Sequence, residues 1–322
     1  MIDPVRSLEA RREQEATRRE AVDKVTSESE AVALIADGDH VAIGGTCYSR
    51  TPMALLFALL RSRRRDLTVS RPLSSFEMEL LLASGTASRL VTTWVGIGLK
   101  WGLPLVLRHY VENGLATYEE WSHLAIGLRY RAGAMGVPFL PGLSMLGSDL
   151  ASAVGLKSVE CPYTGERLAA YPALNPDVAL VHAHRADKFG NAQVDGYFHM
   201  DVDMTRAARK VIVSAEQIVE PERIAAEPAQ TIIPHFAVDA VVEVPYGAYP
   251  AECYGLYEAD YGHFDDYVNE VRRAGADGAR SYVERNAYGH EDFAGFLEAV
   301  GADRLASLGA AARQLVPAGA TR

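Results

Sequence analysis

The sequence has few cysteines and no long apolar run, and both absences narrow the class of protein. Its three cysteines, Cys47, Cys161 and Cys253, are odd in number and far apart, so they do not form a disulfide framework and fit a reducing cytoplasm. No apolar run approaches the length that crosses a bilayer. The first residues mix Glu with Arg, unlike a signal or transit peptide. We therefore expect a cytoplasmic protein that has no membrane partner.

The chain also lacks an excess of basic charge, since 42 acidic residues outnumber 32 basic ones. The formal net charge is −10, which argues against nucleic acid as a partner and leaves room only for a local basic pocket. Hydrophobic residues make up 48% of the 322 residues, enough for a large core in a soluble globular protein. We expect three parts: a charged N-terminal helical extension at 1–30, an α/β domain at 31–260 and a C-terminal helical appendage at 261–322.

Residues 37–52 are the stretch around which the rest is organised. They begin with an Asp-Gly turn, continue with the short apolar strand 41–43 and reach Pro52, which suits the first turn of a helix. Gly44 and Gly45 therefore lie where a strand ends and a helix begins. Glycine there either lets the backbone approach a ligand or only makes a tight turn.

Short apolar strands alternate with helices along the following chain. The predicted strands are 67–70, 90–95, 178–182 and 210–215, and the predicted helices include 53–60, 76–83, 104–112 and 123–135. This alternation predicts an open, mostly parallel sheet with helices on both faces. Such sheets bind ligands at the carboxyl ends of their strands.

A glycine-rich loop at 96–102 follows one of these strands. Its spacing does not match a dinucleotide fingerprint, so we expect no nicotinamide cofactor. We expect the loop, with Gly98, to line the same crevice as Gly44 and Gly45.

Two carboxylates, Glu119 and Glu120, lie at a predicted strand end before a helix, followed by Ser122. Carboxylates in this position cap the helix or complement its dipole. In a dry crevice they also serve as acid–base groups, so both hypotheses stay open.

His182 and His184 share one face of a predicted strand. No motif supplies further metal ligands, so we expect packed or site-lining histidines and no metal. The predicted loop 190–193 carries Asn191 and Gln193, whose amides either bind a substrate oxygen or shape a turn.

Residues 37–52 resemble the first signature of the family I coenzyme A transferases. The matching positions are Asp37, Gly38, 41–43, Gly44, Gly45 and Pro52. Thr46 replaces the Phe that is usual in the family, and Arg50 replaces a Gly. Further blocks resemble the A chains of the glutaconate CoA-transferase branch. These blocks are 119–122, Arg129, 132–141, 145–149, 172–179, 185–187 and 190–193.

The resemblance implies an A subunit that moves CoA between an acyl-CoA and a carboxylic acid. A glutamate nucleophile is then expected on a B-like partner chain in a hetero-oligomer (A2B2 or A4B4), since the family's Ser-Glu-Asn-Gly motif does not occur here. Coenzyme A is a substrate, and no cofactor is expected. Gly44 and Gly45 would let the backbone approach the acyl group. Ser49 and Arg50 would hold a substrate carboxylate, and Arg50 indicates an acidic acyl group.

Two other functions remain open. The chain also resembles the A subunits of steroid ring-opening CoA hydrolases, in which Glu119 or Glu120 would be the acid–base group. The same fold also suits an acyl-CoA-binding regulatory module. Cys47, at the predicted helix start, is either a small packed residue or a thiol of lowered pKa.

Overall fold

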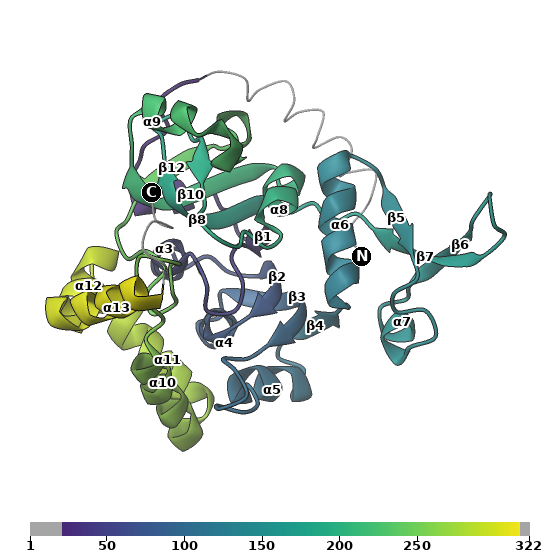
Figure 1. The fold of residues 1–322 in the computed structure, drawn as a ribbon. Coiled ribbons are helices and arrows are strands. Elements are labelled where there is room, and N and C mark those ends of the chain that lie inside the picture. Colours follow the sequence, from purple (N-terminus) through teal and green to yellow (C-terminus); the bar gives the residue numbers. More distant parts are fainter. Residues whose placement is uncertain (1–20, 316–322) are drawn as a thin grey trace.

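The structure, a computed structural model, describes residues 21–315 and is built around one predominantly parallel sheet (Figure 1). Seven parallel strands have the spatial order β12-β10-β8-β1-β2-β3-β4. Their bounds are β1 His40–Ile43, β2 Leu67–Ser74, β3 Ala87–Val95, β4 Thr117–Glu120, β8 Val178–Ala186, β10 Lys210–Ile218 and β12 Ala240–Glu243. Two short antiparallel strands, β9 (Ala192–Gln193) and β11 (Thr231–Ile233), extend from the end of β8. The predicted fold class is therefore confirmed.

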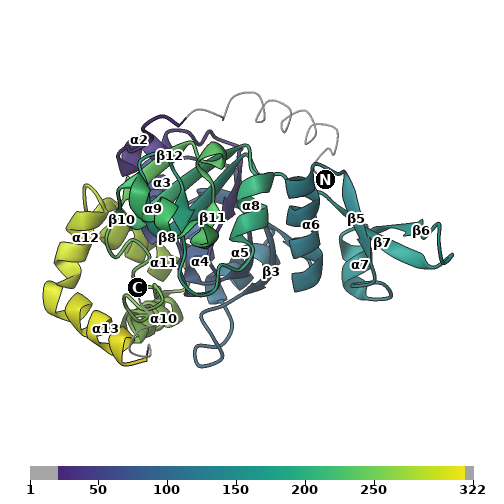
Figure 2. The same cartoon turned by 45° about the horizontal axis from the view of Figure 1, so that its top comes forward.

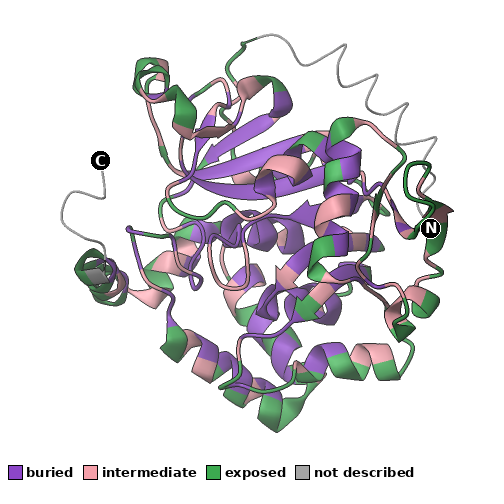
Figure 3. Ribbon diagram, turned by 45° about the vertical axis from the view of Figure 1, so that its right-hand side comes forward, coloured by how far each residue is buried: buried purple, intermediate pink, exposed green. Residues whose placement is uncertain are grey.

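Helices cover both faces of this sheet. α3 (Met53–Arg61), α4 (Phe76–Ala83) and α5 (Leu105–Glu112) contribute to one apolar core, and α6 (His123–Met135) and α8 (Asp201–Ala207) to another. β1 shows why the central strands have almost no polar residues. Val41 and Ile43 pack into the first core and Ala42 into the second, as expected for a parallel strand that is buried on both sides. The strands in the middle of the sheet are coloured as buried in Figure 3.

The remaining helices lie at the two ends of the described chain and beside β11. They are α2 Glu28–Val32, α9 Pro221–Ala226, α10 Tyr261–Ala274, α11 Ala276–Val283, α12 Phe293–Val300 and α13 Ala302–Leu315, with a π-turn at Glu284–Tyr288 and 3-10 turns at Pro228–Gln230 and His235–Ala237. Aromatic contacts fasten the C-terminal helices to the first face. Phe57 of α3 lies 5.5 Å from Phe293, and Phe76 of α4 lies 5.4 Å from Phe264, measured between ring centroids. Between residues 261 and 315 the chain is thus mostly helical, and its helices are continuous with the main core.

A small antiparallel sheet projects from the body beside α6 (Figures 1 and 2). It has the order β5-β7-β6 and comprises β5 Phe139–Gly142, β6 Lys157–Glu160 and β7 Arg167–Pro172, with α7 Asp149–Ala153 between β5 and β6. β6 and β7 pair antiparallel and form a hairpin around Thr164-Gly165-Glu166.

Three predicted boundaries are wrong. Residues 21–27 are not helical, because Val25 pairs with Val241 beside β12; the rest of the predicted N-terminal helix at 1–20 lies outside the described residues. β8 continues to Ala186 and not only to residue 182, whereas the placement of His182 and His184 on one strand is confirmed. Gln193 belongs to β9 and not to a loop. Between residues 21 and 315 no helix has the length and apolar character needed to cross a bilayer.

Candidate active site

The loop that follows β1 is folded tightly at the carboxyl edge of the sheet. Gly45 has a φ of +70°, and a Cβ added there would lie 2.4 Å from the Ser49 carbonyl oxygen, so only glycine fits. Gly44 is equally confined, since an added Cβ would lie 2.8 Å from Val181 and 3.0 Å from Asp201 Oδ1. The signature glycines are thus required by the close approach of the loop to itself and to β8.

The N–H groups of this loop already have acceptors inside the protein. Gly44 donates to Leu180 O (2.8 Å) and Gly45 to Asp201 Oδ1 (2.9 Å). Thr46 and Cys47 donate to the carbonyls of residues 49 and 73. The loop therefore offers a fixed surface for a ligand, and it does not offer these four N–H groups as oxyanion donors.

Arg50 ties the loop to the opposite face of the sheet. Its guanidinium donates to Asp201 Oδ2 (2.8 Å), to the His182 carbonyl (3.0 Å) and to the Tyr197 carbonyl (2.9 Å). Arg50 and Asp201 are both 1% exposed, and Arg50 has a φ of +51°. A non-glycine residue held in this conformation is strained, and such strain is concentrated at functional sites. Both terminal nitrogens of Arg50 are thus hydrogen-bonded inside the protein, while its buried Nε has no partner among the described residues. The contact of Arg50 with a substrate carboxylate stays a prediction.

Ser49 faces a second carboxylate. Glu252 is half-buried beside it, and burial raises the pKa of this carboxyl above its ordinary value although a hydrogen bond from Ser49 acts in the opposite direction. The Glu252 backbone accepts from Arg50 N (2.8 Å) and donates to Tyr48 O (2.7 Å). Sequence reasoning missed Glu252, which lies about two hundred positions away from the loop it supports.

A histidine pair stands next to the loop. His123, the first residue of α6, and His199, just before α8, have Nε2 atoms 2.9 Å apart and stacked rings. His199 has a φ of +49°, and burial lowers the pKa of its imidazole to about 4. The pair adds a polar group to the carboxyl edge that the sequence pattern did not indicate.

The Glu119 carboxylate is hydrogen-bonded by two nearby residues, Trp121 and Arg129. Its Oε1 accepts from Trp121 Nε1 (2.7 Å) and from Arg129 Nη1 (2.9 Å), and the Arg129 guanidinium lies 4.1 Å from the Trp121 ring centre. Burial raises the pKa of the Glu119 carboxyl, but Arg129 and Trp121 more than offset this, and the pKa lies below its usual range. A carboxylate held ionised in this way is a weak base.

Glu120 and Ser122 differ in the hydrogen bonds and ion pairs that their side chains form. Ser122 caps α6 by accepting from Ala125 N (3.2 Å), and its Oγ lies 2.6 Å from Ser144 Oγ. Glu120 is half-buried next to Tyr118, whose phenol pKa is raised to about 12, first by burial and then by Glu120. Of the two glutamates, Glu120 is the one without an ion pair among the described residues.

The glycine-rich loop after β3 lies at the same edge. Gly98 has a φ of +142°, and an added Cβ would lie 3.2 Å from the Trp101 ring. Trp101 Nε1 donates to Asp265 Oδ1 (2.7 Å), and Arg272 donates to Trp101 O (2.9 Å), so α10 holds the loop. Tyr48 of the first loop and Trp101 both contact Phe264, with centroids 6.2 and 6.0 Å away. The expectation that the two loops are neighbours agrees with this contact.

Asn191 and Gln193 have internal partners. Asn191 accepts from His235 N (2.9 Å) and donates to Asp187 (2.7 Å). Gln193 is 1% exposed, accepts from Arg185 Nε (2.9 Å) and donates to the Ile224 carbonyl (3.2 Å). These amides fasten α9 and β11 to β8, and their predicted contact with substrate stays untested.

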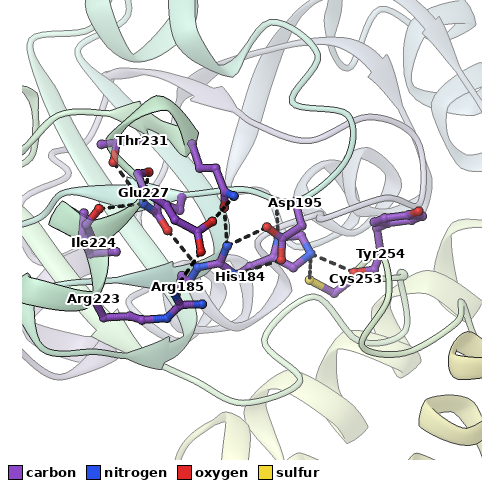
Figure 4. A network of polar contacts seen from close by, with 11 residues as sticks. His184, Arg185, Asp195, Arg223, Ile224, Glu227, Thr231, Cys253 and Tyr254 are labelled. Atoms are coloured by element: carbon purple, nitrogen blue, oxygen red, sulfur yellow. Dashed lines mark hydrogen bonds and ion pairs between the residues drawn. The ribbon is translucent and has the colours of Figure 1, made fainter. Parts of the chain in front are cut away.

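The same network reaches the loop before α10 (Figure 4). Arg185 forms a double ion pair with Asp195 at 2.7 and 2.8 Å, and Asp195 N donates to His184 Nδ1 (3.2 Å). His184 Nε2 in turn lies 2.9 Å from the Tyr254 carbonyl. Burial lowers the pKa of His184 to about 4, so this histidine is neutral and packed.

One group among residues 21–315 has metal-ligand atoms within 4.8 Å of one another: His182, Glu216 and Cys253. His182 Nε2 lies 2.7 Å from Glu216 Oε1, and Glu216 also accepts from the Tyr257 hydroxyl and from Tyr246 N. These hydrogen bonds account for the group as a buried polar network.

The Cys47 thiol in the loop after β1 is not activated. Burial raises its pKa, so the hypothesis of a lowered pKa is wrong.

Comparison with known proteins gives the family. The coenzyme A transferase family matches residues 25–244. An uncharacterised protein of Archaeoglobus fulgidus is 38% identical over 289 residues. The match covers 89% of this chain but only 64% of the relative. The A chain of glutaconate CoA-transferase from Acidaminococcus fermentans is 31% identical over 88% of this chain and 94% of the relative. The IpdA subunit of a cholesterol ring-cleaving hydrolase from Rhodococcus jostii is 36% identical over 75% of this chain and 86% of the relative.

Solved structures agree with this placement. The glutaconate coenzyme A-transferase of Acidaminococcus fermentans superimposes with a TM-score of 0.85 at 30% identity, covering 88% of this chain and 95% of that one. The AibA/AibB decarboxylase superimposes with a TM-score of 0.73 at 33% identity, covering 81% and 98%.

The fold is an open α/β sheet, and the tight loop after β1 lies at its carboxyl edge, the edge at which sheets of this kind bind ligands. The chain belongs to the coenzyme A transferase family, on the side of its A subunits. This placement sets aside the alternative of a purely regulatory module.

Proposed function

We propose that this chain is the A subunit of a heteromeric CoA-transferase and that the attacking glutamate belongs to a B subunit. The observation that supports this most is the loop at residues 44–52, which lies at the carboxyl edge with its backbone fixed by Gly45 and Asp201. It occurs in a chain that aligns with 94% of the A chain of a glutaconate CoA-transferase.

The proposed reaction begins with a partner carboxylate attacking the thioester carbonyl of an acyl-CoA. The C–S bond breaks, leaving a mixed anhydride and the CoA thiolate. The thiolate then attacks the glutamyl carbonyl of the anhydride, forming a glutamyl-CoA thioester and releasing the acyl group as its carboxylate. A second carboxylic acid takes the CoA by the reverse steps. Both acyl transfers develop an oxyanion that needs fixed hydrogen-bond donors.

In this reaction the A subunit positions the acyl group. The N–H groups of Gly44 and Gly45 are already occupied, so we assign the oxyanion donors to other groups, including those of the partner. The Glu119 carboxylate is held by Arg129 and Trp121, which suits a positioning role better than nucleophilic attack.

The test begins with the tagged chain purified from its own host, with the native mass and the partner's sequence recorded. The complex is then incubated with an acyl-CoA and no acceptor acid, and both chains are analysed by intact mass spectrometry. We expect a covalent CoA adduct on the partner, at a glutamate, and none on this chain. The adduct should disappear when an acceptor acid is added and a new acyl-CoA should form.

A ring-opening hydrolase is the second candidate, supported by the free position of Glu120 and by the 36% identity to the IpdA subunit. Such an enzyme would consume water, form no covalent CoA adduct and transfer no CoA to an added acid. That result would replace the transferase proposal. Isolation of the chain without any partner would contradict both.

A further inference from the structure

A direct contact between two histidines lies next to the loop after β1. His123 is the first residue of α6, and His199 comes two positions before α8. Their Nε2 atoms are 2.9 Å apart, and the ring planes differ by only 15°. At this distance one nitrogen carries the hydrogen and the other accepts it, so the contact is an imidazole–imidazole hydrogen bond.

His199 is held in an unfavourable position. Its φ of +49° is in the left-handed region, which residues other than glycine seldom adopt. Its Nδ1 is buried and has no partner of hydrogen-bond geometry between residues 21 and 315. Backbone strain is concentrated at functional sites, and an unsatisfied buried polar atom requires an explanation. This residue therefore calls for a functional explanation as well as a structural one.

The surroundings of His199 determine its charge and its tautomer. Burial lowers the pKa of its imidazole to about 4, so the ring is neutral near pH 7. His123 and Arg71 act in the same direction, and Asp201 opposes them. The Gly45 backbone also raises this pKa, as a carbonyl beside a ring N–H does, although the contact is outside hydrogen-bond geometry. Since Nε2 faces His123, the N–H on the side of Gly45 belongs to Nδ1.

His123 then presents a lone pair. A neutral imidazole has one N–H, so His199 Nε2 is an acceptor and His123 Nε2 donates to it. The lone pair of His123 is on Nδ1, which has no hydrogen-bond partner in the described part of the chain, and the residue is exposed. A base that is oriented through its second nitrogen is the arrangement that general-base catalysis uses.

The proposed transferase steps leave this base without a task. A carboxylate attacks, a thiolate departs and a second carboxylate is released, and no step moves a proton. Water, in contrast, needs a base if it is to attack a thioester efficiently. The ring of His199 lies between His123 and Gly45, so His123 is close to the loop at 44–52, where the acyl group is proposed to lie.

We propose that His123 is the general base of a second activity of this site, the hydrolysis of acyl-CoA, and that His199 is its positioning residue. The oxygen of water bonds to the thioester carbon while His123 Nδ1 takes one proton from the water. The C–S bond then breaks, and His123 returns the proton to the departing CoA thiolate, which leaves a carboxylic acid and CoA thiol. The inference rests on the proposed place of the acyl group at residues 44–52, and not on transfer to the partner's glutamate.

The test uses the purified complex and three probes: acetyl-CoA, butyryl-CoA and glutaryl-CoA. Free CoA is measured by chromatography over many turnovers without an acceptor acid, and transfer is measured with propionate as acceptor. We expect release of CoA from at least one probe, faster than without protein. His123→Ala should lower this hydrolysis about 10²-fold and transfer by much less. No release of CoA from any of the three probes would overturn the inference.

Added imidazole distinguishes a base from a residue that only holds two elements together. It should restore part of the hydrolysis by His123→Ala, after subtraction of its own reaction with the acyl-CoA in the absence of protein. His109→Ala, at an exposed histidine of α5, is the matched control and should neither lose hydrolysis nor respond to imidazole. Equal losses of hydrolysis and transfer in His123→Ala, without rescue, would show that the pair only fastens α6 to the loop before α8.

His199→Asn examines the positioning role. Asn tolerates the left-handed backbone but does not supply the ring nitrogen that accepts from His123. Hydrolysis should fall, and imidazole should not restore it, because His123 still fills its own place. Thermal unfolding and native mass measurements establish that each variant complex is folded and assembled. Hydrolysis at the wild-type rate in this variant would contradict the role of His199.

Hydrolysis and transfer separate this inference from the proposed function. If the complex transfers no CoA but hydrolyses a probe in a reaction that depends on His123 and is rescued by imidazole, the transferase proposal fails and the inference stands. If the complex transfers CoA and imidazole restores nothing in His123→Ala, the transferase proposal stands and the inference is wrong.

Discussion

The Arg50 guanidinium lies 2.8 Å from the Asp201 carboxylate, and each side chain is only 1% exposed. The ion pair joins the loop after β1 to the first residue of α8, which belongs to the opposite face of the sheet. Asp201 uses its other oxygen to accept from Gly45 N, so one carboxylate fixes both the arginine and the glycine of the signature. The shape of the proposed site thus depends on a residue that the signature does not contain.

Asp201→Ala should therefore lower stability strongly. It leaves the Arg50 charge buried without its counterion, which costs about 3–5 kcal/mol in comparable cases. Asp203→Ala on the same helix is the matched control, because its partner Arg131 is 60% exposed and the pair is 3.4 Å apart; we expect a change of at most about 1 kcal/mol. Urea unfolding of both variants measures the difference. Equal losses would show that the buried pair has no special role.

Gly45→Ala should disrupt the loop for a reason beyond backbone strain. Its Cβ would lie 2.4 and 2.6 Å from the carbonyl oxygens of Ser49 and Arg50. Gly38 has a similar φ, +80°, but nothing lies within 4 Å of an added Cβ. Gly38→Ala should therefore lower the free energy of unfolding by only about 1–2 kcal/mol, the usual penalty for a left-handed non-glycine residue. Gly45→Ala should lower it by clearly more and should also abolish CoA transfer. Thermal unfolding and the transfer assay measure both, and similar values for the two variants would exclude the steric argument.

The sequence was sufficient to predict β1, the turn into α3 and the alternation that makes the sheet parallel. These features depend on local turn chemistry and apolar runs, which act within a few residues. The role of Arg50 could not be predicted in the same way, because its partner Asp201 lies 151 positions further along the chain. The sequence offers an arginine near a glycine pair, and only the fold decides whether its charge faces a substrate or a carboxylate of the protein.

Glu119 and Gln193 illustrate the same limit at the candidate site. The sequence correctly placed the block from Glu119 to Ser122 between a strand end and a helix. It did not predict that Arg129 approaches Glu119 from the second turn of α6. Gln193 was expected in a loop because Gly190 and Asn191 precede it. It lies instead in a two-residue strand that pairs with the end of β8 on one side and with β11, about forty positions away, on the other. Short strands formed by long-range pairing have no local signal.

The buried histidines predict acid sensitivity. His184 accepts from Asp195 N at Nδ1 and lies 2.9 Å from the Tyr254 carbonyl at Nε2, so a second proton would displace the Asp195 contact. Its pKa is about 4 in the folded protein, against an ordinary value of 6.5. The unfolded chain therefore binds the proton first as pH falls. The neutral form therefore contributes its full stabilisation above about pH 6.5, and this contribution is lost as the pH falls from there through about 4. Within that window the free energy of unfolding decreases by about 1.4 kcal/mol per pH unit for each such proton.

His184→Gln should remove one proton from the uptake that accompanies unfolding between pH 6.5 and 4. The charged or polar side chains that face His184, namely Asp195, Arg50, His182 and Cys253, remain in the variant. His40, His199 and His263 also have pKa values lowered to about 4 by burial, so a substantial pH dependence should persist. His109→Gln, at an exposed position, is the control. Urea unfolding at several pH values measures the slope, and an unchanged slope for His184→Gln would contradict its assignment as a neutral buried group.

Glu119→Gln and Glu120→Gln separate the two candidate reactions. In the transferase neither residue is the nucleophile, so we expect Glu120→Gln to retain most of the turnover. Glu119→Gln should instead lower stability at neutral pH, because Arg129 loses its carboxylate. Since the pKa of Glu119 is below its ordinary value of 4.5, that difference from the wild type should be present above about pH 4.5 and vanish as pH falls through the lower folded value.

The hydrolase hypothesis makes the opposite forecast for Glu120. A general base that activates water is essential, and its loss typically lowers the rate by about 10²–10⁴-fold. A complex of Glu120→Gln that assembles normally but has lost turnover to this extent would therefore favour hydrolysis, and retention of CoA transfer would exclude Glu120 as an essential base. Native mass measurements on each variant complex keep the two effects apart, because a failure to assemble would lower turnover for a structural reason.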